Sequence, residues 1–222
     1  MGRINTIVFD LDGTLLNTLD DIADSMNYAL EECGYPKREK SEIRKFIGGG
    51  ASVLVASAVP EGLSASEVDA CKNIFLRHYV KNANNKTDLY DGIRPLIHRL
   101  AADGYPMGVV SSKGDGPVKE LIHSYFGEDM AVAIGERPDI RKKPAPDAVL
   151  KAIEILQSET EQAVYVGDSE VDVETAKNAG IPCIIVTWGF RDREDLVKLN
   201  PDYIVDTAEE LYDVIKRHYS GW

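Results

Sequence analysis

The residue types most capable of chemistry in this chain occur in four short groups. They are Asp10-Leu11-Asp12-Gly13-Thr14, Ser111-Ser112-Lys113, Arg141-Lys142-Lys143-Pro144 and Gly167-Asp168-Ser169-Glu170-Val171-Asp172. Each group alone has an ordinary structural explanation, such as a turn, a helix cap or a solvated charged face. Together they supply acids, hydroxyls and a lysine, a set that could bind a divalent cation and a phosphate.

The acids are the candidate metal ligands. Asp168 and Asp172 are four residues apart where a helix pattern begins, so they should lie within about one turn of each other. Asp10 and Asp12 crowd a turn that Gly13 keeps sterically open. Carboxylates this close must be compensated, and ligands that offer only oxygen suit Mg²⁺. We therefore expect Asp10, Asp12, Asp168 and Asp172 to gather Mg²⁺, with Lys143 as the cation beside it.

The elements that must position these groups alternate between short apolar runs and amphipathic stretches. This alternation predicts an α/β fold, with a parallel sheet and right-handed crossovers. In such a sheet, ligands bind at the carboxyl ends of the strands. The predicted strands are Thr6–Phe9, Met107–Ser111, Ala131–Ile134, Ala163–Val166, Cys183–Val186 and Tyr203–Val205. The predicted helices between and after them are Ile93–Ala102, Gly116–Tyr125, Ala145–Ile155, Val171–Ala179 and Ala208–His218.

One interval breaks the alternation. About 96 residues separate Asp10 from Met107, whereas a crossover needs only about 10–12. No strand is evident in this interval. Its helix patterns are Leu19–Cys33, Ser41–Phe46, Ala51–Ala58 and Ser64–Asn82. We therefore expect a helical cap domain at residues 16–86, inserted into a discontinuous core formed by residues 1–15 and 87–222.

The set Asp10-x-Asp12-Gly-Thr, Ser111, Lys143-Pro and Gly167-Asp168-x-x-x-Asp172 resembles the haloacid dehalogenase superfamily in motif order and spacing across the whole chain. The resemblance implies a Rossmann-like, doubly wound parallel core with an inserted α-helical cap. It also implies that Asp10 is a nucleophile that forms an aspartyl-phosphate. Mg²⁺ would be held by Asp10, the backbone carbonyl of Asp12 and Asp168, while Asp172 orients the cluster or binds through water.

The same resemblance assigns the remaining catalytic roles. Asp12 would protonate the leaving oxygen and then activate water. Dehalogenases lack an acid at this position, so Asp12 favours phosphoryl transfer. Ser111 would hydrogen-bond a phosphoryl oxygen. Lys143 would offset the charge of the transferring group and anchor Asp10.

Within the superfamily, the stretch that begins Asp12-Gly-Thr-Leu-Leu-Asn and the triplet Trp188-Gly189-Phe190 are similar to the phosphoglycolate phosphatase group. The group carries a glycine-containing specificity loop where this chain has Gly48, Gly49 and Gly50. The resemblance implies that this loop, Thr14 and Ser112 contact the substrate. Ser112 stands where the group often has Asn, and we interpret Lys113 as a residue at the start of a helix.

These observations predict a Mg²⁺-dependent phosphatase for a small organic phosphomonoester such as phosphoglycolate. A phosphomutase of the β-phosphoglucomutase type is an alternative, because it shares all four motifs. A third possibility is a non-enzymatic phosphoaspartate switch or binding protein. Receiver domains also pair acids with a lysine, although they are about half this length and carry no helical cap.

The composition of the chain disfavours some classes of partner and some cellular locations. The chain has 25 Lys+Arg against 37 Asp+Glu, a formal net charge of −12, which disfavours nucleic acid as a partner. No apolar run is long enough to span a membrane, and the apolar run near the N-terminus is too short for a signal peptide. Cys33, Cys71 and Cys183 are widely spaced, so we expect free thiols in the cytoplasm. We expect a monomer or a homodimer.

Overall fold

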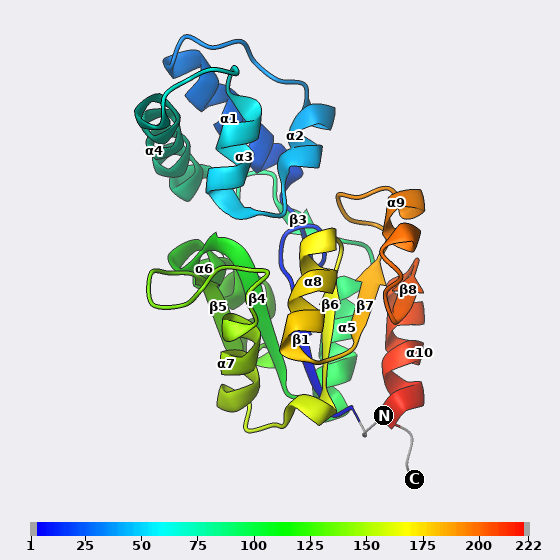
Figure 1. The fold of residues 1–222 in the computed structure, drawn as a ribbon. Coiled ribbons are helices and arrows are strands. Elements are labelled where there is room, and N and C mark those ends of the chain that lie inside the picture. Colours follow the sequence, from blue (N-terminus) through cyan, green and yellow to red (C-terminus); the bar gives the residue numbers. More distant parts are fainter. Residues whose placement is uncertain (1–3, 220–222) are drawn as a thin grey trace. The chain divides into compact units, whose positions relative to one another are not determined.

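The computed structural model describes residues 4–219 (Figure 1). These residues form two compact units. The core unit runs to Leu16 and resumes at Leu89, and the helical unit is Asn17–Asp88. The chain therefore leaves the core once and returns to it once.

The core unit contains a six-stranded parallel sheet with the order β5-β4-β1-β6-β7-β8. In this order β1 lies between β4 and β6, with Phe9 beside Val109 on one side and beside Val166 on the other. The carboxyl ends of these three strands are therefore adjacent. The strands are β1 (Thr6–Phe9), β4 (Met107–Gly114), β5 (Val132–Glu136), β6 (Ala163–Gly167), β7 (Cys183–Val186) and β8 (Tyr203–Val205).

Helices cover both faces of this sheet, as Figure 1 shows. Strand residues contribute alternately to two apolar clusters, because successive side chains of a strand point to opposite faces. Ile7 and Phe9 pack with helices α5, α6 and α10, whereas Val8 packs with α7, α8 and α9. The helices are α5 (Ile93–Ala102), α6 (Asp115–Phe126), α7 (Asp147–Ile155), α8 (Glu170–Ala179), α9 (Arg193–Lys198) and α10 (Ala208–Tyr219). Two short 3₁₀ turns lie at Gly127–Asp129 and Thr160–Gln162.

Strand β4 is longer than the sequence predicts. The prediction ended it at Ser111, but it continues to Gly114, which pairs with Glu136 of β5 after an irregularity in the register. Lys113 therefore lies in a strand, and α6 begins only at Asp115. The interpretation of Lys113 as a helix-start residue is wrong, because tertiary pairing with β5 overrides the low strand propensity of the sequence Ser-Ser-Lys-Gly.

The helical unit contains four helices: α1 (Leu19–Glu32), α2 (Lys40–Phe46), α3 (Gly50–Ala58) and α4 (Ala65–Asn82). Local capping fixes some of their ends. Ser64 and Glu67, for example, form a reciprocal capping box at the start of α4. The buried carboxylate of Asp21 in α1 accepts hydrogen bonds from the backbone amides of Lys86 and Thr87, at 2.9 Å each from Oδ2, which fastens the returning chain to α1.

The expectation that the inserted interval carries no strand is wrong at its two ends. The two-residue strands β2 (Leu16–Asn17) and β3 (Asp88–Leu89) pair where the chain passes between the units. Strands of this length leave no detectable alternation of apolar and polar residues. Among the residues that the structure describes, no helix combines the length and the apolar character needed to cross a bilayer.

Candidate active site

Three acids meet at the carboxyl ends of β1 and β6. Asp10 follows β1 directly, Asp168 follows β6, and Asp172 lies in the first turn of α8. One carboxylate oxygen of each lies within 4.8 Å of the others. All three are buried, with exposed fractions of 6%, 2% and 1% for Asp10, Asp168 and Asp172. The pairing of β1 with β6 thus brings together acids that are far apart in the sequence.

Lys143 is the cation of this cluster. It lies in the loop between β5 and α7, and its Nζ donates to Asp10 Oδ1 at 2.9 Å and to Asp172 Oδ1 at 2.6 Å. Its side chain is only 4% exposed. The Nζ also lies 5.3 Å from the ring centre of Tyr165, a buried residue of β6 that sequence analysis did not single out. The ring supports the ammonium group through a cation–π contact.

Asp172 has both carboxylate oxygens engaged by the protein. Oδ1 accepts from Lys143, while Oδ2 accepts from the backbone amides of Asp168 and Ser169 and from Ser169 Oγ. Gly167 allows this approach, because a Cβ there would overlap the Asp172 side chain. Asp172 is therefore well placed to hold Lys143 and the turn that carries Asp168.

The electrostatics of the cluster show an excess of negative charge. Burial raises the pKa of Asp10 from 3.8 to about 7; Lys143 opposes the rise, and Asp172 and Asp12 add to it. Burial, with Asp172 and Asp10, raises the pKa of Asp168 well above its usual range. Burial acts to lower the pKa of Lys143, but Asp10 and Asp172 outweigh it and raise the value. One lysine does not balance three buried carboxylates, so this oxygen-only donor set fits a divalent cation.

Asp12 stands apart from the three clustered acids. Its Oδ1 accepts from Lys113 Nζ at 2.5 Å, and its Oδ2 is 3.4 Å from the Ser111 hydroxyl. Both partners come from β4, where Ser111 and Lys113 are two residues apart and buried. Residues at this spacing share a face of a strand. The two-residue spacing of Ser111 and Lys113 could have identified Lys113 as a partner of the site, if the predicted strand had extended past Ser111.

The remaining candidate residues are placed as follows. The Thr14 hydroxyl is buried and makes no hydrogen bond within residues 4–219. Ser112 is half-buried, and its side chain makes no hydrogen bond to the acids in the described part of the chain. Gly48, Gly49 and Gly50 belong to the helical unit, between α2 and α3, where Gly48 and Gly50 have φ of 129° and 79°. These positive φ values account for Gly48 and Gly50, and a Cβ at Gly49 would overlap the side chain of Val53.

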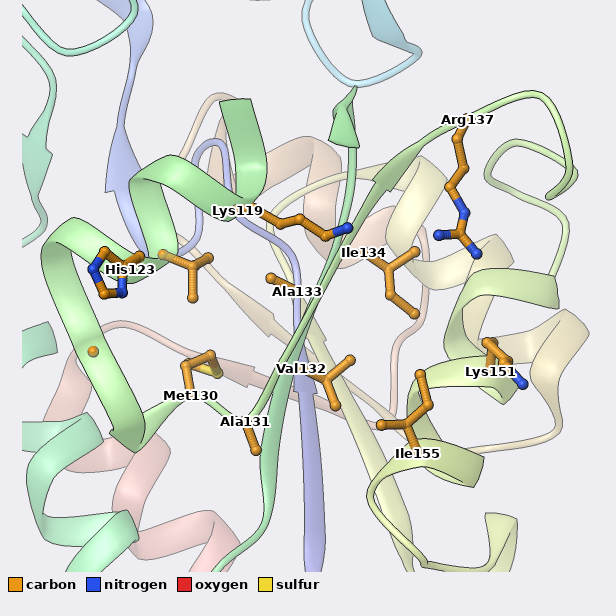
Figure 2. Close-up of a pocket in the computed structure, with 12 residues that line it drawn as sticks. Lys119, His123, Met130, Ala131, Val132, Ala133, Ile134, Arg137, Lys151 and Ile155 are labelled. Atoms are coloured by element: carbon orange, nitrogen blue, oxygen red, sulfur yellow. The ribbon is translucent and has the colours of Figure 1, made fainter. Parts of the chain in front are cut away.

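A surface hollow of about 390 Å³ lies elsewhere in the core unit, along the edge strand β5 (Figure 2). Figure 2 shows its lining side chains coming from β5 itself and from α6 and α7 on either side of it. Its cations are paired with nearby acids, as with Lys119 and Asp115 at 2.6 Å and Lys151 and Glu154 at 2.8 Å. None of the acids described above lines this hollow, so it is separate from the cluster.

Comparisons with known proteins agree with this geometry. Residues 7–186 match the model of the haloacid dehalogenase-like hydrolase family. The chain is 31% identical to a phosphoglycolate phosphatase of Aquifex aeolicus, over 97% of this chain and 98% of the relative. It is 32% identical to that of Mesorhizobium japonicum, over 92% of each chain. A solved structure from Lactobacillus delbrueckii subsp. bulgaricus, for which the same activity is proposed, has a TM-score of 0.91 at 32% identity and covers 97% of this chain and 99% of its own.

Proposed function

Since the chain belongs to the haloacid dehalogenase-like hydrolases, we propose that it is a Mg²⁺-dependent phosphatase that acts through an aspartyl-phosphate on Asp10. The relatives make it a phosphoric monoester hydrolase. The substrate is a small organic phosphomonoester, and phosphoglycolate is the first to test, because the relatives compared above carry that name.

The observation that carries this proposal is the buried cluster of Asp10, Asp168 and Asp172 around Lys143, with Asp12 close in sequence but held separately by Lys113. A nucleophilic carboxylate needs no base, only relief from repulsion by the phosphate it attacks. Lys143 supplies part of that relief. Asp12 has a partner set of its own, Lys113 and Ser111, and we assign it the proton transfers.

Asp10 and Asp168, with the backbone carbonyl of Asp12, would hold Mg²⁺, while Asp172 orients Lys143 and the Asp168 turn. When bound, the ion supplies positive charge that lets the cluster accept a dianionic phosphate. The raised pKa values of Asp10 and Asp168 in the metal-free protein support this assignment. They reflect a lack of positive charge in the cluster, which a bound cation would supply.

The chemistry has two steps. Asp10 attacks phosphorus, the bond from phosphorus to the ester oxygen breaks, and Asp12 donates a proton to the departing alcohol. A water molecule then attacks phosphorus and Asp12 takes its proton. The bond from phosphorus to the Asp10 oxygen breaks, which restores the Asp10 carboxylate and releases inorganic phosphate. Ser111 would hydrogen-bond a phosphoryl oxygen, and Lys143 would balance charge on the transferring group in both steps.

A phosphate-release assay over a panel of phosphomonoesters, with Mg²⁺ and the full chain, tests this proposal. We expect turnover of phosphoglycolate or another small monoester, and none in excess EDTA. Release no faster than in the EDTA control for every compound would refute the proposal. β-Glucose 1-phosphate with a bisphosphate primer belongs in the panel, because glucose 6-phosphate as the main product would instead indicate the mutase.

The apparent affinity for Mg²⁺ should weaken as the pH falls. The pKa of Asp10 is about 7 in the folded, metal-free protein against 3.8 for the free side chain. The folded state therefore binds more protons between these values, and metal-free stability should fall as pH rises through this window. Mg²⁺ must displace this proton, so its apparent affinity should weaken by up to about tenfold per pH unit below pH 7.

Thermal unfolding with EDTA or Mg²⁺, at about pH 5.5 and about pH 8, measures this linkage. The stabilisation that Mg²⁺ provides should be larger at the higher pH. Equal stabilisation at both pH values would mean that no carboxyl of the cluster exchanges a proton for the ion.

Replacement of Asp12 by Asn should affect substrates according to their leaving groups. An alkyl alcohol needs a proton as it departs, whereas p-nitrophenolate does not. In Asp12→Asn, kcat/KM should therefore fall about 10²–10⁴-fold for an alkyl phosphate and much less for p-nitrophenyl phosphate. Steady-state kinetics with both substrates tests this prediction. Equal losses of kcat/KM for the two substrates would show that Asp12 is not the acid that protonates the leaving group.

A further inference from the structure

The loop from Thr187 to Arg191 follows β7 and precedes α9, and it contains no residue of the proposed chemistry. It includes the triplet Trp188-Gly189-Phe190, which resembles the phosphoglycolate phosphatase group in sequence. Because β7 pairs with β6, this loop emerges beside the strand that carries Asp168.

The loop contacts Asp168 directly. The backbone amide of Phe190 donates to Asp168 Oδ2 at 2.7 Å, and both residues are buried. The hydrogen bond fixes which oxygen faces the loop and leaves Oδ1 for another partner. A buried carboxylate held at one oxygen has little freedom to turn about its χ angles.

Three further contacts hold the loop in place. The indole Nε1 of Trp188 donates to the carbonyl of Thr14 at 3.0 Å, so the loop is tied to the turn that carries Asp10 and Asp12. Thr187 Oγ1 donates to Asp206 at 2.7 Å. The Arg191 guanidinium makes a two-pronged contact with Glu170, at 2.7 and 2.8 Å. The Phe190 amide is therefore presented by a segment anchored on both sides.

Gly189 is required by the same packing. A Cβ at this position would overlap the Asp168 carboxylate and the carbonyl oxygen of Gly13. A Cβ at Gly13, whose φ is 91°, would overlap the Asp168 carboxylate as well. Asp168 is thus enclosed between two glycine backbones, one from the Asp10 turn and one from the loop after β7.

We propose that Trp188, Gly189 and the Phe190 amide are positioning residues that orient the Asp168 carboxylate for Mg²⁺ and thereby set the affinity for the ion. The inference rests on the proposed metal site. Outer-shell groups that orient a ligand typically change metal affinity by about 10–100-fold when they are lost. Because Gly189 and the Phe190 amide contact Asp168 itself, their effect should appear first in metal binding.

The test is calorimetric titration of Mg²⁺ into the full chain, without substrate. Gly189→Ala should weaken binding by about 10–100-fold, because its Cβ displaces Asp168. Trp188→Phe keeps an aromatic ring but loses the bond to Thr14, and should weaken binding by about 3–10-fold. Gly116→Ala is the matched control: a Cβ added at Gly116 would extend into open space, so wild-type affinity is expected.

Two reference measurements separate the possible failures. Wild-type protein that does not bind Mg²⁺, or Asp168→Asn that binds it as tightly as wild type, would refute the proposed metal site itself. If wild type binds, Asp168→Asn does not, and both loop variants bind like wild type, the positioning role is overturned. Thermal unfolding in EDTA shows whether Gly189→Ala is folded. If it is not, the Mg²⁺ affinity of Trp188→Phe alone tests the positioning role.

Discussion

Replacing Asp10 by asparagine is expected to reduce phosphate release by about 10⁴-fold or more while stabilising the metal-free protein. The amide cannot attack phosphorus, so the loss of activity follows from chemistry. The gain in stability follows from electrostatics. Burial raises the pKa of Asp10 to about 7 against the attraction of Lys143, so above that pH the folded protein carries a charge at Asp10 that is less costly in the unfolded chain. A neutral side chain of the same shape removes this cost.

The measurement combines a phosphate-release assay with thermal unfolding in EDTA at about pH 8. Asp69→Asn is a suitable control, because Asp69 is an exposed acid of α4 that pairs at the surface with Lys72, at 2.6 Å. It should leave both activity and stability near wild type. An Asp10→Asn protein that retains turnover would remove Asp10 from the role of nucleophile, whatever its stability.

Replacing Lys143 by methionine should have the opposite effect on stability. Its removal leaves Asp10 and Asp172 without their shared cation in a buried site, and breaking such a pair costs about 3–5 kcal/mol. The free energy of unfolding in EDTA should fall by this amount at about pH 8. The loss should be smaller near pH 5, where the raised pKa values of Asp10 and Asp168 favour their neutral forms. Activity should fall at least about 10³-fold.

Lys142→Met provides the matched control for this variant. Lys142 is the neighbouring lysine, but its side chain is 62% exposed and pairs with Glu136 at the surface, where ion pairs contribute about 0–1 kcal/mol. Denaturant unfolding of both variants at the two pH values decides the question. A Lys143→Met protein as stable as Lys142→Met would show that the buried cluster does not depend on its lysine.

Much of the core could be predicted from the sequence because its strands are short, apolar and buried on both faces. The strands Thr6–Phe9, Cys183–Val186 and Tyr203–Val205 have the predicted bounds, as does the helix Ile93–Ala102. The rule that ligands bind at the carboxyl ends of parallel strands also predicted that Asp10 and Asp168 lie at the same end of the sheet. The short helix Arg193–Lys198 was missed, since six residues are too few to show a helical period.

The contacts that complete the site could not be predicted, because they depend on the packing of distant segments. Lys113 reaches Asp12 only because pairing with β5 extends β4 beyond Ser111. Phe190 reaches Asp168 through its backbone amide, which every residue type except proline possesses, so its identity gives no signal. The closeness of Gly189 to Asp168 likewise becomes visible only when β6 and β7 are side by side.

Trapping of the covalent intermediate tests the central claim most directly. Wild-type protein is mixed with Mg²⁺ and excess substrate, quenched in acid during turnover and digested for mass spectrometry. We predict one phosphoryl group on the peptide that carries Asp10, lost on alkaline treatment as expected of an acyl phosphate, and none in Asp10→Asn. Turnover without any phosphorylated peptide, or with the phosphoryl group on another residue, would contradict the assignment of Asp10 as the nucleophile.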